Sequence, residues 1–160
     1  MALIKKSIGL DPGTEKSGIC IVIDNVPVYA AKLPNIEILA LISAHRNALV
    51  VAIEGMQHYK GCPAGNEVFQ AIRWGGRFEE RAHSLGIPSF YYTKPDWARS
   101  LVGRGRKITD AGVRTALELR FGGYNKGQPL NVLKGNSDMR SACGVILYHL
   151  DIMRMGQLAN

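Results

Sequence analysis

The chain has 160 residues, of which 46% are hydrophobic and 21% are charged. This composition excludes a disordered chain and favours a single domain over residues 1–160. No apolar run approaches the roughly 18 residues of a membrane span, and the N-terminus has no signal-peptide pattern, so we expect a cytoplasmic protein without a membrane partner. Lys and Arg number 20 against 13 Asp and Glu, and the net charge of +7 suits a polyanionic partner.

The first half of the chain predicts three strands in a meander, then a helix and a buried strand. The strands are expected at residues 2–10, 19–23, 26–31 and 49–53, and the helix at 35–45. Asn35 is available as the N-cap of that helix.

The second half is mainly helical. A long helix is expected at residues 66–85, with Gly75 and Gly76 as a place for a kink, followed by a strand at 89–92 and helices at 94–102, 110–121 and from 137 onward. Residues 124–135 are polar and predict a loop. This order of elements predicts an α/β fold with a mixed sheet flanked by helices.

The cysteines, Cys20, Cys62 and Cys143, are odd in number, lie far apart and form no C-x-x-C motif. Cys20 and Cys143 lie in apolar runs and are interpreted as core residues. Cys62 follows His58 by four residues, but two ligands do not make a zinc site. The pattern favours a reducing compartment.

Three acids follow or begin predicted elements. Asp11 ends the first strand before a Pro-Gly turn, Glu54 ends the buried strand, and Asp138 lies in the first turn of the last helix. Each also has a purely structural interpretation, as a turn starter, a strand terminator and a partner of the helix dipole. If the two strands are neighbours, Asp11 and Glu54 share one crevice at the carboxyl edge of the sheet, and Asp138 could join them there.

Three clustered acids repel one another and raise their own pKa values unless a divalent cation neutralises them. Oxygen ligands favour Mg²⁺, with Mn²⁺ as a substitute. A basic protein with an acidic metal pocket makes physical sense if the substrate is a phosphodiester backbone, which the cation would polarise.

Basic and aromatic side chains offer DNA-binding surfaces. Arg73, Arg77 and Arg81 recur every four residues and form either a DNA face or a solvated helix face. The loop after Glu54 suits contact with unstacked bases, or is a surface loop; its residues are Gln57, His58, Tyr59 and Lys60. The basic loop between the helices at 94–102 and 110–121 carries Arg104, Arg106 and Lys107. Trp74 and Trp97 are interpreted as core residues rather than DNA platforms.

Several motifs in order resemble the RuvC-type Holliday-junction resolvases of the ribonuclease-H-like nuclease superfamily, including phage-type members. They are Ile-Gly-Leu-Asp-Pro-Gly at 8–13 with Ser-Gly at 17–18, Ala-Ile-Glu at 52–54, Gly-Arg-Gly-Arg-Lys at 103–107 and Ser-Asp-Met-Arg-Ser-Ala at 137–142. The resemblance implies a ribonuclease-H-like five-stranded sheet in a bacterial or phage-encoded protein. It also implies a homodimer that resolves four-way junctions by paired symmetric nicks, leaving 5′-phosphate and 3′-hydroxyl ends.

The resemblance further implies two Mg²⁺ per active site, held by Asp11 as the bridging ligand with Glu54 and Asp138, while Lys107 contacts the scissile phosphate. One position departs from the family pattern Asp-x-x-Asp-Ala, because Ser141 stands where the second acid would be. Residues at i and i+3 share a helix face, so Ser141 occupies the position of the fourth ligand with a poorer donor. A water molecule or another acid would have to replace the missing carboxylate, and Asp110 and Glu118 are acids on the preceding predicted helix whose position the sequence does not give.

Three alternatives stay open at this point. The chain could be a branched-DNA-binding module of the same fold with weak or lost cleavage, because Ser141 is neutral. It could process RNA or another branched intermediate with the same pocket chemistry. Residues 10–14 also resemble the first phosphate loop of actin-like sugar kinases and ATPases, but those chains are usually more than twice as long as this one.

Overall fold

A computed structural model describes residues 5–57 and 64–158 of the protein. One mixed sheet has the strand order β3-β2-β1-β4-β5. Its strands are β1 (Lys6–Asp11), β2 (Lys16–Ile23), β3 (Val26–Pro34), β4 (Val51–Gly55) and β5 (Ser89–Thr93). The first three strands form an antiparallel meander, whereas β4 and β5 run parallel to β1. The predicted mixed five-stranded sheet is confirmed, and β1 and β4 are neighbours, which was the condition for Asp11 and Glu54 to share one crevice.

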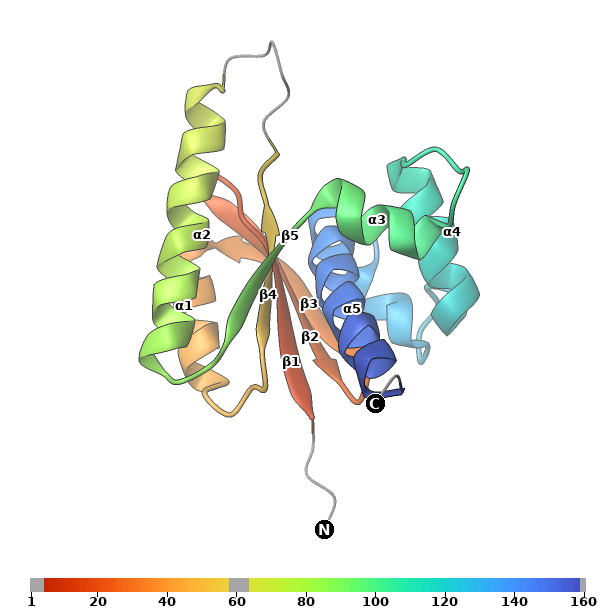
Figure 1. Cartoon of the computed structure of the whole chain (residues 1–160), viewed down its shortest axis with the longest axis horizontal. Coiled ribbons are helices and arrows are strands. Elements are labelled where there is room, and N and C mark those ends of the chain that lie inside the picture. The colour runs from red at the N-terminus through yellow and green to blue at the C-terminus, as the bar shows by residue number, and fades with distance from the viewer. Residues whose placement is uncertain (1–4, 58–63, 159–160) are drawn as a thin grey trace.

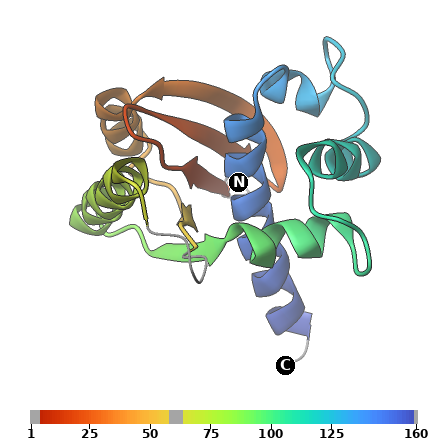
Figure 2. The same cartoon turned by 90° about the horizontal axis from the view of Figure 1, so that it is seen from above.

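Helices cover both faces of this sheet (Figure 1). The helices α1 (Asn35–Ala44) and α2 (Asn66–Ser84) cover one face, and α5 (Ser137–Leu158) crosses the other. The remaining helices are α3 (Lys94–Val102), α4 (Asp110–Phe121) and the 3-10 helix η1 (Pro129–Leu133), which packs against β3. Figure 2 shows α5 as the layer between the sheet and α4. Among the described residues, no helix is both long enough and apolar enough to cross a membrane.

Strand alternation divides the buried side chains between two cores. Leu10 and Ile53 belong to the core under α1 and α2, whereas Cys20 and Ala52 belong to the core under α5. Cys143 of α5 is also fully buried in this second core, so the prediction that Cys20 and Cys143 are core residues is confirmed. Cys62 lies outside the described residues.

Two glycines let α5 approach the sheet very closely. A Cβ atom on Gly9 would overlap the carbonyl oxygen of Ala142 and lie 2.8 Å from Ile146 Cγ2. A Cβ on Gly18 would overlap the carbonyl oxygen of Asp138. The first turns of α5 therefore rest directly on the backbones of β1 and β2, which fixes where the acid at the start of α5 lies.

The structure corrects three sequence predictions. The strands β2 and β3 are each three residues longer than predicted where they pair, because Lys16 aligns with Pro34. The predicted loop at 124–135 contains η1, because Leu130 and Leu133 are buried in the core under α5. Asn35 is the first residue of α1 rather than its N-cap, because its side-chain amide donates to the Gly13 and Thr14 carbonyls of the turn after β1.

Candidate active site

One row of residues crosses all five strands near the carboxyl ends of β1 and β4. Lys32 of β3 aligns with Gly18 of β2, and Gly18 aligns with Asp11 of β1. Asp11 and Glu54 each follow the last residue paired between β1 and β4, and Glu54 aligns with Tyr92 of β5. Backbone pairing thus places the two carboxylates side by side.

Both carboxylates face α5. Side chains alternate along a strand, and the preceding residues, Leu10 and Ile53, point into the core under α1 and α2. Asp11 and Glu54 therefore point to the opposite face. The turn after Asp11 is fixed by a buried network in which the Gly13 N–H donates to Ser17 Oγ over 3.0 Å. The strand end and its turn hold the Asp11 side chain in a rigid frame.

The start of α5 brings the third acid to the row. The side-chain oxygen of Asn136 accepts hydrogen bonds from the backbone N–H groups of Asp138 and Met139, over 2.9 and 3.2 Å, and so caps the helix. Because Asp138 lies over Gly18, it stands between Asp11 on one side and Lys32 on the other. The Lys32 ammonium forms an ion pair with Asp138 Oδ2.

Burial and mutual repulsion raise the pKa values of the acids in the row. Burial, then the nearby charges of Glu54 and Asp138, raise the pKa of Asp11 to about 8. Burial also raises the pKa of Glu54, although the positive charge of Lys94 and a hydrogen bond from Trp97 act against this rise. Lys32 has a raised pKa because it donates a hydrogen bond to Asp138. The two strand carboxylates are therefore short of compensating positive charge.

The start of α3 completes the wall of the site next to Glu54. The backbone N–H and hydroxyl of Thr93 both donate to Asp96 Oδ2, which starts α3 directly at the end of β5. The next residue, Trp97, is fully buried and its indole N–H donates to Glu54 Oε2 over 3.0 Å. The prediction that Trp97 is a core residue is confirmed, and the structure adds its hydrogen bond to the site. Half-buried Trp74 packs on Phe78 of the other core.

Ser141 lies one turn after Asp138 on α5 and is only 6% exposed. Helix periodicity places it between Asp138, which stands over the sheet, and Gly144, against which Trp97 packs. Ser141 therefore faces the space between the row and α3. Its hydroxyl brings no negative charge to this space.

The donor set fits one hard divalent cation. Asp11 and Glu54 lie on adjacent strands, face the same side and lack a neutralising partner, which is the environment that an oxygen-liganded cation relieves. Asp138 is engaged by Lys32. Within residues 5–57 and 64–158, no group of three or more His, Cys, Asp and Glu side chains is arranged to hold a metal ion.

The basic loop before α4 ends close to the site. Lys94 of α3 forms a 3.2 Å ion pair with Asp110 at the start of α4, and Asp110 also acts electrostatically on Glu54. The loop between these helices therefore returns to the neighbourhood of the row just before Asp110. Its cationic side chains are all exposed; they are Arg104, Arg106 and Lys107.

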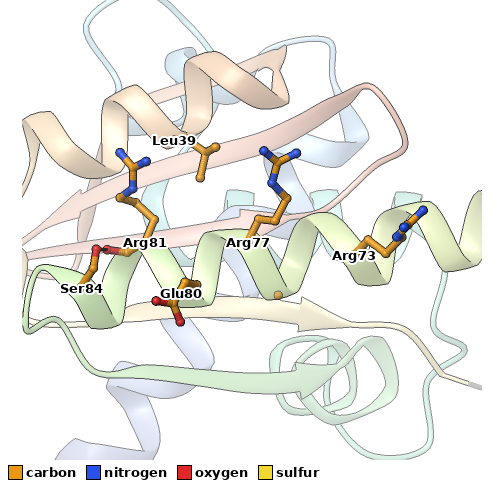
Figure 3. Close-up of a pocket in the computed structure, with 7 residues that line it drawn as sticks. Leu39, Arg73, Arg77, Glu80, Arg81 and Ser84 are labelled. Atoms are coloured by element: carbon orange, nitrogen blue, oxygen red, sulfur yellow. Dashed lines mark hydrogen bonds between the residues drawn. The ribbon is translucent and has the colours of Figure 1, made fainter.

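The arginine stripe of α2 lies in the other helical layer, away from the carboxylates. Arg73, Arg77 and Arg81 line one open cavity of about 620 Å³ beside α1, and Figure 3 shows Arg77 and Arg81 directed toward the side of Leu39. Arg77 lies 4.2 Å from the ring centroid of Trp74, and Arg81 donates to Ser43 Oγ of α1. The three arginines therefore form a basic groove, and one of them, Arg81, also links α2 to α1.

The loop after Glu54 is described only in part. Gln57 is exposed just beyond the carboxyl end of β4. The other predicted base-contacting residues, His58, Tyr59 and Lys60, lie outside the described residues.

Sequence reasoning missed two cations of the site. Lys32 was hidden because the third strand was predicted to end before it, and only strand register reveals its place in the row. Lys94 was missed because its influence on Asp11 and Glu54 depends on where α3 begins.

The fold and the row define an α/β protein with an acidic site at the carboxyl edge of its sheet. No protein-family model and no curated protein matches the sequence. Among solved structures, the chain is similar to Thermus thermophilus RuvC, with 18% identity and a TM-score of 0.68 over 94% of this chain and 96% of that one. It is also similar to T. thermophilus RuvC in complex with Holliday junction substrate, with 20% identity and a TM-score of 0.73 over 95% and 96%. The chain has the RuvC fold, which confirms the predicted ribonuclease-H-like architecture.

Proposed function

We propose that this protein is a divalent-cation-dependent endonuclease that resolves four-way DNA junctions by paired symmetric nicks. The observation that carries the proposal is the row itself, in which Asp11 and Glu54 stand side by side under Asp138 on a RuvC fold. One of the similar RuvC structures contains a Holliday junction substrate. A net charge of +7 adds long-range attraction for such a polyanion.

The proposed chemistry is hydrolysis of a phosphodiester that leaves a 5′-phosphate and a 3′-hydroxyl. A bound Mg²⁺ or Mn²⁺ would polarise the phosphate and lower the pKa of a water molecule. Asp11 and Glu54 would hold it, and the hydrogen bond from Trp97 to Glu54 Oε2 leaves the other carboxylate oxygen, Oε1, to serve as ligand. Lys107 is proposed to contact the scissile phosphate.

The remaining basic residues are proposed to bind the junction arms. Arg104 and Arg106 lie on the exposed loop that ends near the row, and Gln57 extends the surface past β4. The proposal includes His58, Tyr59 and Lys60 on the same loop as Gln57. The groove of Arg73, Arg77 and Arg81 offers phosphate contacts farther from the site.

Symmetric nicks on two strands need two active sites, so we propose a homodimer. Phe69 and Ile72 support it, because they lie one turn apart on α2 and are 56% and 51% exposed. Contiguous exposed apolar side chains of this kind are typical of protein interfaces. Sedimentation of Ile72→Glu tests the choice of surface: a monomer is expected, and an unchanged dimer would place the interface elsewhere.

A second candidate is a branched-DNA-binding module with weak or lost cleavage. The observation that favours it is Ser141, buried at a position where a carboxylate would add a cation ligand. This candidate keeps the junction specificity and loses the nicking rate.

The test compares a labelled four-way junction with plain duplex in Mg²⁺ or Mn²⁺, using the natural chain, Asp11→Asn and Ser141→Asp. Junction nicks made by the natural chain and abolished by Asp11→Asn support the nuclease. Cleavage by Ser141→Asp alone would establish the binding module instead. No cleavage and no junction preference in any variant would refute both.

A further inference from the structure

Lys32 brings a permanent positive charge into the row of carboxylates. It lies on the edge strand β3, aligned with Gly18, and Gly18 is aligned with Asp11. Lys32 and Asp11 therefore sit two strands apart on the same face of the sheet. The space between them, above Gly18, is taken by Asp138, whose Oδ2 is paired with the Lys32 ammonium.

A second divalent cation would need this same place. It would have to bind Asp138, beside a first cation bound by Asp11 and Glu54. Asp138 is already paired with the Lys32 ammonium. The next position on this side of α5 is Ser141, which adds no charge. A Mg²⁺ ion there would have one shared carboxylate as its ligand and a lysine ammonium as its neighbour, a donor set much poorer than such ions select.

The backbone holds this arrangement in place. An exposed Lys–Asp pair is usually weak, and these side chains are 42% and 34% exposed. Here, however, Lys32 is placed by strand register and Asp138 by a capped helix that rests on Gly18. The backbone positions of both residues are therefore fixed before the side chains meet, and the remaining entropy cost is mainly that of ordering the lysine side chain.

We propose that Lys32 is a positioning residue that takes the place of a second divalent cation, so that the row binds one such ion, on Asp11 and Glu54. The inference rests on the proposed function and deepens it, because it replaces the two ions implied by the family resemblance with one ion and one ammonium group. Lys32 acts through Asp138, which it neutralises and holds beside Asp11.

The experiment counts Mn²⁺ ions bound to the full chain without DNA, by electron paramagnetic resonance of free Mn²⁺ during titration. The variants are Lys32→Met, which removes the charge, and Lys32→Arg, which keeps it. Lys126→Met is the matched control, since Lys126 is an exposed lysine in the segment before η1. Asp11→Asn identifies the ion held by the row.

We expect one ion in the natural chain, in Lys32→Arg and in Lys126→Met, and loss of that ion in Asp11→Asn. Lys32→Met frees Asp138 and is expected to bind two ions under the conditions where the natural chain binds one. Two ions in the natural chain, or an unchanged count of one in Lys32→Met, would overturn the inference. So would a second ion in Lys126→Met, because the effect would then be one of overall charge.

Cleavage of a four-way junction by the same preparations separates this inference from the function on which it rests. If the counts are as expected but no variant cuts or prefers the junction, the proposed function fails and the role of Lys32 in ion binding stands. If the natural chain cuts the junction while holding two ions, the function stands and the inference fails.

Discussion

The indole nitrogen of Trp97 donates a 3.0 Å hydrogen bond to Glu54 Oε2, and this bond ties α3 to the carboxylate row of the sheet. The ring of Trp97 is fully buried and packs against α5 at Gly144, where an added Cβ would lie 2.5 Å from Trp97 Cε3. One side chain thus joins the sheet, α3 and α5, and it fixes the orientation of a proposed cation ligand.

Trp97→Phe is expected to weaken the site more than the fold. A phenyl ring still fills part of the space, but Glu54 loses a donor and the core loses part of the indole, so we expect about 2 kcal/mol less stability and roughly tenfold weaker Mn²⁺ binding. Urea unfolding and Mn²⁺ titration measure the two effects. Trp74→Phe is the control, because Trp74 lies in the other core. Unchanged Mn²⁺ affinity in Trp97→Phe would show that the hydrogen bond does not position Glu54 for a cation.

Gly9→Ala is expected to disrupt the contact between α5 and the sheet. Its Cβ would overlap the Ala142 carbonyl oxygen, which belongs to helix backbone and cannot rotate away. We expect a loss of about 3 kcal/mol in the free energy of unfolding. Gly76→Ala is the matched control, because nothing lies within 4 Å of its added Cβ, and alanine should add about 0.5–1 kcal/mol in a helix interior. Similar stabilities for the two variants would contradict the close approach of α5.

The acidic row predicts an unusual dependence of stability on pH. Asp11 has its pKa raised from 3.8 to about 8 in the folded chain without a cation. Between these values the folded state keeps a proton that the unfolded state has released, so stability is full below about 4 and falls as pH rises through about 8.

The variant that tests this dependence is Asp11→Asn, which removes the titrating group. We expect its advantage over the natural chain, measured by urea unfolding in a chelator, to grow with pH to the order of 2 kcal/mol, since Asp11 is only partly shielded from solvent. Saturating Mn²⁺ should stabilise the natural chain and not the variant. Parallel pH profiles for the two proteins would show that the acids do not strain the fold.

Substitutions in the basic loop before α4 are expected to affect junction binding and the cleavage rate differently. Arg104→Ala and Arg106→Ala should each weaken junction binding and lower the slope of log affinity against log salt by about 0.9 per lost phosphate contact. Lys107→Ala should also lower the single-turnover cleavage rate of bound junction. Lys126→Ala serves as the charge control. Equal effects of all four substitutions would mean that only net charge matters.

The sequence indicated that Asp11, Glu54 and Asp138 could gather at one edge of the sheet, because each acid lies at a recognisable strand end or helix start. A strand that ends in an acid before a glycine can be recognised from a few neighbouring residues, as at Glu54. The parallel pairing of β1 and β4, on which the shared crevice depends, is supplied by the structure. The fold was predictable for the same reason, since apolar alternation and turn residues mark each element.

Lys32 could not be predicted in this way. Its role depends on strand register, which aligns Lys32 with Gly18, and on the close packing of the start of α5 against that glycine. The composition around Lys32 is that of an ordinary exposed edge strand. The buried turn η1 escaped prediction for a related reason, because only the packed structure shows that Leu130 and Leu133 of a polar segment enter the core.

The proposed resolvase activity can be measured by mapping nicks on a four-way junction whose strands are each end-labelled, with Mg²⁺ supplied or chelated. We expect nicks at symmetric positions on two opposing strands, with 5′-phosphate and 3′-hydroxyl ends, that require the cation and disappear in Asp11→Asn. Nicks scattered over junction and duplex alike, or nicks that persist in Asp11→Asn, would contradict it.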